Sequence, residues 1–300
     1  MNLKEKFFKN GFISPLNILS EREAKNINHE YHRFLFRSNL KSTDIVEHKS
    51  KTHLFFPWAN KLIFNDRIQD YVSKILGKNF LCWNSLIFYK KANSNSFVSM
   101  HQDQNYWGIK KDKSLTVGLA ISESNEKNGC LKILPNSHRK NFKHHDFEKK
   151  NNMLARGQTI QFTKKNKDNL LDINLKAGQS CIFHGNIVHG SYENKSNKPR
   201  FIFAMRFLTP DNQVNKKLYY NNATLVSGVD EYNNFIKEPT LLNCNQKKMQ
   251  KLHRLIMIQQ FSKYLKLKVK FNFLSKILMF YLKKDFLRGI VYKVSGKTNL

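Results

Sequence analysis

The chain has 300 residues, of which 40% are hydrophobic and 13% aromatic. That is enough for a sizeable core in one large domain with additions, and it excludes a wholly disordered protein. The 52 Lys and Arg residues against 22 Asp and Glu give a formal net charge of +30. A charge this positive is typical of proteins that meet nucleic acid, an anionic membrane surface or a phosphate-bearing substrate. Codon usage in an A/T-rich genome favours Lys, Asn, Ile and Phe and produces the same charge, so both explanations stay open.

Two helices are predicted early in the chain. Residues 20–23 read Ser-Glu-Arg-Glu, a capping box that opens a polar helix running toward Phe34. A second helix is predicted over Asp66–Leu76, where the apolar residues form one stripe and Gly77 follows as a stop signal.

The middle of the chain has a different texture. Short apolar or β-branched runs are separated by Gly, Pro, Asn and Ser, which favours a β-sandwich or barrel over alternating βαβ units. These predicted strands cover residues 80–89, 114–121, 130–134, 179–183 and 201–208.

Residues 247–300 differ again, since they contain 14 Lys or Arg residues and a single acid, Asp285. Apolar residues among the lysines predict a basic, amphipathic, mainly helical extension, although residues 265–273 alternate in a way closer to a strand. Three roles are possible for the apolar side of this extension: packing on the β domain, peripheral contact with an anionic membrane, or contact with a partner or second subunit. We therefore divide the chain into a β domain (1–210), a connecting segment (211–246) and this extension (247–300).

The cysteines and the apolar runs predict the compartment. Cys82, Cys130, Cys181 and Cys244 lie far apart without a CxxC pair, which favours unpaired core thiols over disulfides or a zinc cluster. No apolar stretch of secretory or membrane-spanning length is evident. We expect a cytoplasmic protein, with peripheral contact at the inner face of a membrane as the one membrane role left open.

The segment with the most chemical information is residues 100–107, MHQDQNYW. In an extended strand, positions i and i+2 project to the same side, so His101 and Asp103 can offer a nitrogen and an oxygen to one metal ion. His189, in FHGNIVHGS, is the candidate third ligand. Two imidazoles and a carboxylate leave three coordination positions free, which suits non-heme Fe(II). Zinc catalysis with the same ligands is the alternative, but no separate carboxylate base is evident.

A single arginine adds a second signal. Arg200 follows His189 by 11 positions and precedes the predicted strand 201–208. There its guanidinium can bind the far carboxylate of a dicarboxylate as a bidentate pair, and the alternative is a salt bridge at the strand end.

With these residues in place, the sequence resembles the phytanoyl-CoA dioxygenase family of Fe(II)/2-oxoglutarate-dependent oxygenases. The resemblance runs from about residue 7 to residue 210. It begins with FFKNGFI and continues through HQDQNYW, NGCLKILPNSHRK (128–140) and AGQSCIFHGNIVHGSYENKSNKPR (177–200).

The resemblance implies a role for each matched residue. His101, Asp103 and His189 correspond to the iron ligands, and Arg200 to the anchor for the distal carboxylate of 2-oxoglutarate. Ser191 resembles a residue that assists this anchor through its hydroxyl. Trp107 takes a place where some relatives have an aromatic residue that lines the cosubstrate pocket, with core packing as the alternative. The implied fold is mainly β with flanking helices: a double-stranded β-helix (a cupin-like jelly roll) followed by the basic extension.

Three further residues in the matched segments receive structural interpretations. His184 competes with His189 as a ligand, but in the family pattern it belongs to the strand before the turn, which favours a core or supporting role. His138 and Arg139 lie in a family-typical turn.

The activity implied by the resemblance is hydroxylation of an unactivated C–H bond in a small organic or acyl-type substrate. The reaction consumes O₂ and 2-oxoglutarate and releases succinate and CO₂. Halogenating relatives lack the carboxylate ligand, so Asp103 favours hydroxylation, with desaturation or cyclisation left open. We expect a small-molecule substrate, anionic or thioester-linked.

Two alternatives come from other functional classes. One is a catalytically silent β-helix used for binding, and the other is a basic membrane- or nucleic-acid-associated protein. The chain shows no helix-turn-helix, zinc-finger or RNA-binding strand motif, so we do not expect a nucleic-acid partner.

Overall fold

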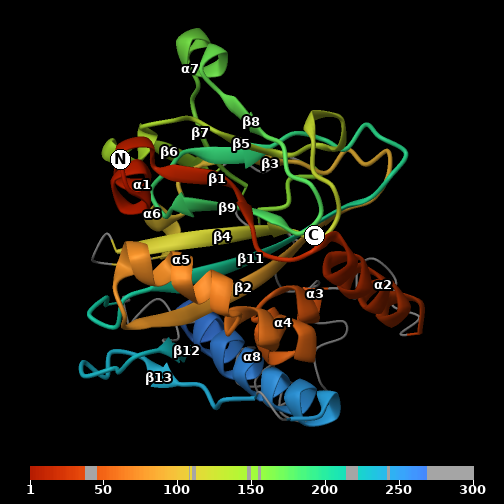
Figure 1. Cartoon of the computed structure of the whole chain (residues 1–300), viewed down its shortest axis with the longest axis vertical. Helices are drawn as coiled ribbons and strands as arrows, with labels where there is room; N and C mark the ends of the chain where they lie inside the picture. The colour runs from red at the N-terminus through yellow and green to blue at the C-terminus, as the bar shows by residue number, and fades with distance from the viewer. Residues whose placement is uncertain are drawn as a thin grey trace.

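The chain folds around two β-sheets that face each other (Figure 1). The computed structural model describes residues 1–37, 46–107, 109, 113–146, 150–154, 157–213, 222–241 and 244–268. The larger sheet has seven strands in the order β1-β9-β4-β11-β2-β12-β13, and the smaller has four in the order β3-β10-β5-β8. Neighbouring strands in the two sheets are antiparallel except for β12 and β13. The predicted mainly β fold with flanking helices is therefore confirmed.

The strands of the larger sheet are β1 (Phe12–Asn17), β9 (Gln179–His184), β4 (Ser114–Ala120), β11 (Arg200–Leu208), β2 (Phe80–Lys90), β12 (Asn222–Ser227) and β13 (Ile236–Lys237). Those of the smaller sheet are β3 (Val98–His101), β10 (His189–Ser191), β5 (Leu131–Ile133) and β8 (Leu171–Ile173), and a separate hairpin pairs β6 (His144–Asp146) with β7 (Gln158–Ile160). The α-helices are α1 (Leu3–Asn10), α2 (Glu21–Arg37), α3 (Val46–Lys49), α4 (Pro57–Ile63), α5 (Asp66–Leu76), α6 (Gln104–Trp107), α7 (Lys164–Asp168) and α8 (Gln246–Lys268). Three short 3₁₀ helices are η1 (Thr52–Leu54), η2 (Glu126–Asn128) and η3 (Ser137–Arg139).

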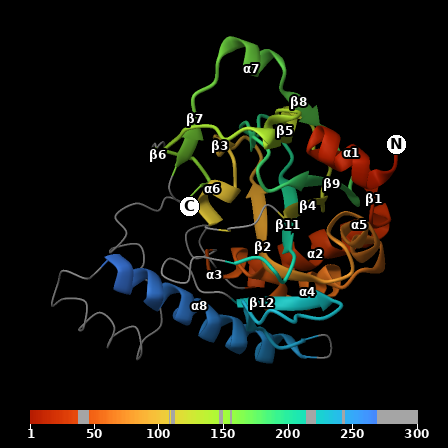
Figure 2. The same ribbon diagram turned by 90° about the vertical axis from the view of Figure 1, so that its left-hand side faces the viewer.

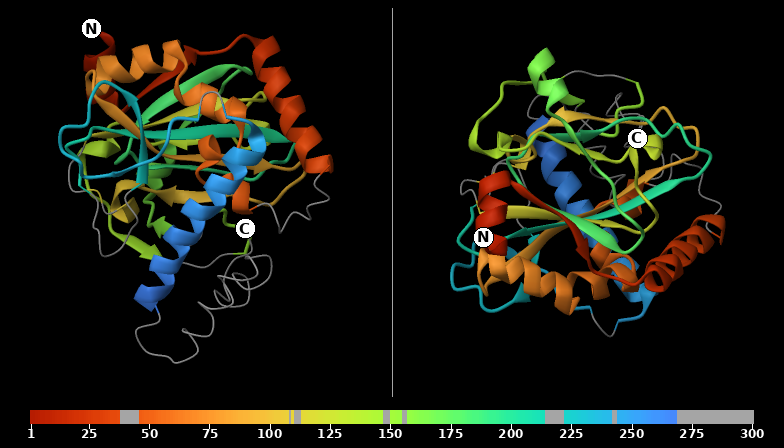
Figure 3. Two further views of the ribbon diagram at one scale, coloured as in Figure 1. Left: turned by 90° about the horizontal axis from the view of Figure 1, so that it is seen from below. Right: turned by 45° about the horizontal axis from the view of Figure 1, so that its top comes forward.

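The larger sheet separates a helix-covered core from the space between the sheets, as the right panel of Figure 3 shows. Because successive side chains of a strand point to opposite faces, β11 contributes to both sides. Its alternate residues in the helix-side core are Phe201, Phe203, Met205 and Phe207. Those that line the space between the sheets are Arg200, Ile202, Ala204 and Arg206.

Both predicted helices form where local signals place them. The Glu23 carboxylate accepts hydrogen bonds from the Ser20 backbone N–H and hydroxyl, both at 2.7 Å, and the Glu23 N–H donates to the Ser20 hydroxyl at 3.2 Å. The capping box therefore opens α2 as predicted. Helix α5 begins after Asn65, whose side chain accepts from the first-turn N–H groups, and ends at Gly77.

The five predicted strands are also confirmed, as β2, β4, β5, β9 and β11, each within two residues of its predicted ends. The cysteine prediction holds as well, because all four cysteines are free and three of them are buried.

The C-terminal extension begins with helix α8. Figure 2 shows α8 beside β12, where Met249 and Ile256 pack against Leu54 and Leu241. The first half of the helix thus packs on the β domain, while Leu255, on another face, is 52% exposed. The alternation at residues 265–273 had suggested a strand. For residues 265–268 this was wrong, because they belong to α8, and the remaining residues of the pattern lie outside the described part of the chain. Membrane contact by 247–300 stays a prediction.

The predicted connecting segment contains structure that the sequence did not reveal. Strand β12 pairs with β2 and extends the larger sheet, and β13 pairs with β12. The proposed domain boundaries stay predictions, but the described part of 211–246 contributes to the β fold. Within the described residues, none of the helices combines the length and apolar character needed to cross a membrane.

Candidate metal centre and its cavity

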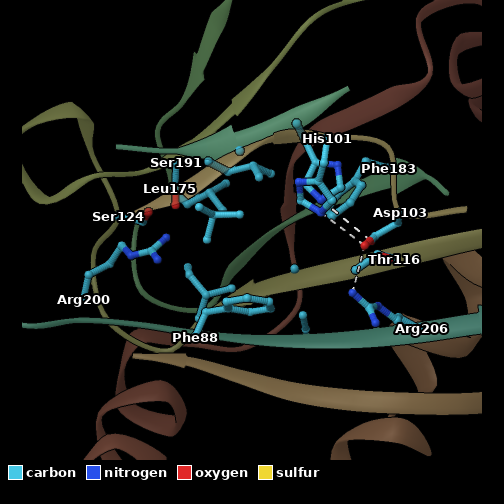
Figure 4. Close-up of a pocket in the computed structure, with 17 residues that line it drawn as sticks. Phe88, His101, Asp103, Thr116, Ser124, Leu175, Phe183, Ser191, Arg200 and Arg206 are labelled. Carbon is cyan, nitrogen blue, oxygen red and sulfur yellow. Dashed lines mark hydrogen bonds and ion pairs between the residues drawn. The ribbon is translucent and has the colours of Figure 1, made fainter. Parts of the chain in front are cut away.

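The two predicted histidine ligands lie opposite each other on neighbouring strands. His101 ends β3 and His189 begins β10, and the two residues are register partners whose ring centroids are 4.3 Å apart. Asp103 lies beyond the strand, just before α6. The expectation that one strand carries both His101 and Asp103 is therefore wrong, because the chain turns after His101. The turn still brings the three side chains together (Figure 4), with one possible ligand atom from each lying within 4.8 Å of the others.

The imidazole orientations prepare both histidines for coordination. The Nδ1 of His101 lies 2.8 Å from the Ser99 carbonyl oxygen, and the Nδ1 of His189 lies 3.0 Å from the Ile187 carbonyl oxygen. A carbonyl can only accept, so each Nδ1 donates, and this fixes each ring with its Nε2 turned toward Asp103. The Nε2 atoms lie 3.3 Å and 3.7 Å from the two oxygens of Asp103. The two Nε2 atoms and the carboxylate thus converge on one point.

For His189 and Asp103, the electrostatics favour the protonation states that a metal requires. Burial, followed by the nearby His101, lowers the pKa of His189 to about 4, so its ring is neutral at pH 7. Burial by itself raises the pKa of Asp103, but Arg206 and the two imidazoles outweigh it and hold the pKa well below its usual range.

Arg206 is the site residue that sequence reasoning missed. Its Nη2 donates to Asp103 Oδ1 at 3.0 Å, and its guanidinium carbon lies 4.5 Å from the centre of the Trp107 ring. The two-residue period of β11 could have identified Arg206 from the sequence. Arg206 lies six positions after Arg200, so both arginines must face the same side of the strand.

Trp107 packs against Arg206 and is separate from the cavity lining. Its ring packs 5.5 Å from that of Trp83 in a buried cluster, and Trp107 is not among the described residues that line the cavity. The alternative interpretation of this residue, core packing, matches its place in the structure. From there it supports the arginine that holds Asp103.

The opposite end of the same cavity is formed by Arg200 (Figure 4). Arg200 is 3% exposed, and no carboxylate pairs with it among the described residues. Its Nε and the hydroxyl of Ser124 are both buried without a hydrogen-bond partner. Burial lowers the pKa of Arg200 to about 10, which leaves it charged at pH 7. An unpaired guanidinium in an enclosed cavity is suited to a carboxylate that arrives with a ligand.

Between the two ends the cavity is mostly apolar. Its walls include Phe88, Val98, Leu131, Leu175 and Ile202. The cavity therefore has the His-Asp-His triad at one end, an apolar middle and a cationic end.

The other histidines of the matched segments have structural partners. His184 Nδ1 accepts the Asn186 N–H at 3.0 Å, and the His184 ring packs against those of Phe7 and His138. His138 Nε2 donates to the Phe8 carbonyl at 3.1 Å, and the Arg139 guanidinium donates to the same carbonyl at 3.3 Å. This turn thus holds α1 against the β core.

A buried triad of two imidazoles and a carboxylate, facing a cationic pocket between two sheets, defines a class of metal-binding jelly-roll proteins. The chain belongs to the phytanoyl-CoA dioxygenase (PhyH) family, whose model matches residues 7–202. A probable alpha-ketoglutarate-dependent hypophosphite dioxygenase from Stutzerimonas stutzeri is 28% identical over 182 residues, 58% of this chain and 61% of that protein. The match thus spans less than two thirds of that relative. Human peroxisomal phytanoyl-CoA dioxygenase is 23% identical over 234 residues, 69% of this chain and 68% of that protein.

Solved structures share the fold. The non-heme monooxygenase ThoJ in its apo form superposes with a TM-score of 0.75 at 25% identity, covering 90% of this chain and 99% of ThoJ. CytC3 with Fe(II) and alpha-ketoglutarate superposes with a TM-score of 0.59 at 24% identity, covering 78% of this chain and 90% of CytC3.

Proposed function

We propose that this protein is an Fe(II)- and 2-oxoglutarate-dependent oxygenase and that its two facing sheets are a double-stranded β-helix. His101, Asp103 and His189 hold the iron. The observation that carries the proposal is the pairing of two features in one cavity: the converging donors at one end and the unpaired Arg200 at the other. The relatives described above, which include an alpha-ketoglutarate-dependent dioxygenase and a non-heme monooxygenase, support this assignment.

The donor set fits iron in this role. Two imidazoles with converging Nε2 atoms and one carboxylate would occupy three positions and leave three for other ligands. Bound iron supplies the activation of O₂ that couples decarboxylation of 2-oxoglutarate to substrate oxidation, with succinate and CO₂ as products.

The protein's own residues orient the cosubstrate and protect the reaction. Arg200 binds the distal carboxylate as a bidentate pair, and Ser191, which also lines the cavity, assists it. The apolar walls exclude water from the space between the anchor and the metal. Arg206 holds the Asp103 carboxylate in the orientation that the metal needs.

The reaction that we propose is hydroxylation of an unactivated C–H bond. Asp103 fills the position that would otherwise be open to a halide, so oxygen transfer is favoured over halogenation. The relatives described above are named for substrates as different as hypophosphite and phytanoyl-CoA. For this chain we propose a small organic or acyl-type substrate, anionic or thioester-linked.

The test is production of succinate from 2-oxoglutarate by the purified protein with Fe(II) in air. We expect His189→Ala to abolish both iron binding and succinate formation, because it removes one of three ligands. His145→Ala is the matched control, since His145 is an exposed histidine outside the cavity. Iron bound equally well by His189→Ala would refute the ligand assignment. Iron binding without any turnover in the unaltered protein would favour the catalytically silent binding protein.

A further inference from the structure

Lys90 is a buried basic residue at the anchor end of the cavity that the proposed function has not used. It is the last residue of β2 and the register partner of Arg200 on β11, so both side chains leave the larger sheet on the cavity side. Lys90 is 0% exposed, and no carboxylate contacts it or Arg200 among the described residues. Two basic side chains thus share one end of the cavity, and neither is in contact with a described carboxylate.

The contacts of Lys90 lead directly to Ser191. The Lys90 Nζ donates to the Ser191 hydroxyl oxygen at 2.8 Å, to the Gly129 carbonyl at 3.4 Å and to the Tyr192 carbonyl. An ammonium group has three donors and no acceptor, so these three oxygens use all of its protons. Because the Ser191 oxygen accepts from Lys90, its own proton must point elsewhere. No described residue accepts that proton, and Ser191 lines the cavity.

The charge balance also calls for an anion at this end. Burial, followed by the neighbouring Arg200, lowers the pKa of Lys90 to about 6, against weaker opposing effects of Cys130 and Glu193. With that pKa, Lys90 is mostly neutral at pH 7 in the ligand-free protein. A carboxylate bound beside Lys90 and Arg200 would offset their mutual repulsion, raise the pKa of Lys90 and so hold Lys90 in its charged, donating form.

We infer that Lys90 is a positioning residue for the distal carboxylate of the cosubstrate. It acts through Ser191, whose hydroxyl it holds as a donor into the cavity, and it adds a second positive charge beside Arg200. The inference rests on the proposed function, because it takes 2-oxoglutarate as the ligand at this end. It implies that the pocket discriminates strongly between a 2-oxo acid with a distal carboxylate and one without it.

The experiment compares two ligands on the Fe(II)-loaded protein without oxygen, by calorimetry. 2-Oxoglutarate carries the distal carboxylate, and 2-oxopentanoate has the same chain length without it. We expect Lys90→Met to weaken 2-oxoglutarate binding by about 10- to 100-fold, the range for losing charged hydrogen bonds, while 2-oxopentanoate and iron bind as before. Lys91→Met is the matched control, since Lys91 is the next residue and is exposed.

A second variant, Lys90→Gln, keeps the test decisive if Lys90→Met does not fold, because its amide keeps a hydrogen-bond donor but removes the charge. It must also lower the preference for 2-oxoglutarate over 2-oxopentanoate. Ser191→Ala must lower the same preference, and adding the Lys90 substitution to it must cost less than that substitution alone. An unchanged preference in either single variant overturns the inference while leaving the proposed function intact. Failure of the unaltered protein to bind 2-oxoglutarate at all overturns the proposed function itself.

Discussion

Two buried groups of charged side chains lie at the larger sheet, and they differ in how completely their hydrogen bonds are made. In the cavity, Arg200 Nε and the Thr116 hydroxyl have no partner. The second group, here called the Glu238 cluster, is a buried network of five side chains: Lys51, His53, Ser85, Thr224 and Glu238. Lys51 Nζ and the Thr224 hydroxyl donate to the Glu238 carboxylate at 2.6 Å and 2.7 Å. His53 lies 3.2 Å from that carboxylate and 2.7 Å from the Ser85 hydroxyl.

The difference separates a structural network from a binding site. A fully bonded buried network contributes to one folded state, and the Glu238 cluster joins η1, β2, β12 and the segment after β13. Donors buried without partners cost stability, and they are tolerated where a ligand completes them. If the contrast is right, changes in the Glu238 cluster lower stability most, and changes at the cavity lower it least.

The largest effect is expected from Glu238→Gln. The substitution leaves the Lys51 ammonium buried without its counter-charge, so the free energy of unfolding should fall by about 3–5 kcal/mol. Urea denaturation measures the change. Glu231→Gln, at an exposed glutamate, should change it by less than about 0.5 kcal/mol. Equal effects of the two substitutions would mean that the Glu238 cluster does not stabilise the fold.

Acid should weaken the same cluster. Burial raises the pKa of Glu238, but Lys51 and His53 outweigh it and lower the pKa to about 2 from an ordinary value of 4.5. The carboxylate therefore contributes its stabilisation fully above about pH 4.5 and loses it as the pH falls toward 2. The stability difference between the unaltered protein and Glu238→Gln should shrink over that window in urea denaturation at successive pH values. A constant difference would contradict the assignment.

A matched pair of threonines compares the two groups directly. Thr224→Val removes the hydroxyl that donates to Glu238 and should cost about 1–3 kcal/mol. Thr116→Val removes a buried hydroxyl without a hydrogen-bond partner and should cost less than about 0.5 kcal/mol or stabilise the protein. Thermal or urea unfolding of both variants measures this. A larger cost at Thr116 would reverse the contrast between the two groups.

The smallest effect on stability, with a large effect on binding, is expected from Arg200→Met. Removal of a buried cation that lacks a described carboxylate partner should leave the unfolding free energy of the ligand-free protein unchanged or higher. Affinity for 2-oxoglutarate should fall about 100-fold, roughly 3 kcal/mol, with iron content unchanged. Unfolding and calorimetric titration of the same samples report both quantities. Unaltered affinity would remove Arg200 from the anchor role.

Local signals account for what could be predicted from the sequence. The capping box at Ser20 and the stop signal at Gly77 each depend on hydrogen bonds between residues no more than four positions apart. Helix α2 begins at the first signal and α5 ends at the second. The alternation of β11 follows from strand geometry and would have revealed Arg206 had its period been followed past Arg200. The chain turn between His101 and Asp103 was missed because nothing in MHQDQNYW marks the end of β3.

Long-range contacts account for the rest. Lys51 and Glu238 are 187 positions apart, and Lys90 and Ser191 are 101 positions apart. No periodicity or spacing within a segment connects such pairs, because strand order brings them together.

The sequence by itself determined the chemical inventory of this protein: two histidines, an aspartate and an arginine in family order, on or beside short strands whose positions local propensity sets. Only the tertiary structure decided how that inventory is arranged. The pairing of β3 with β10 places the two imidazoles next to each other, and the facing sheets align the triad with Arg200 across one cavity. The physical reason is that coordination and ion pairing act over a few ångströms, and only the packing of distant strands brings these side chains that close.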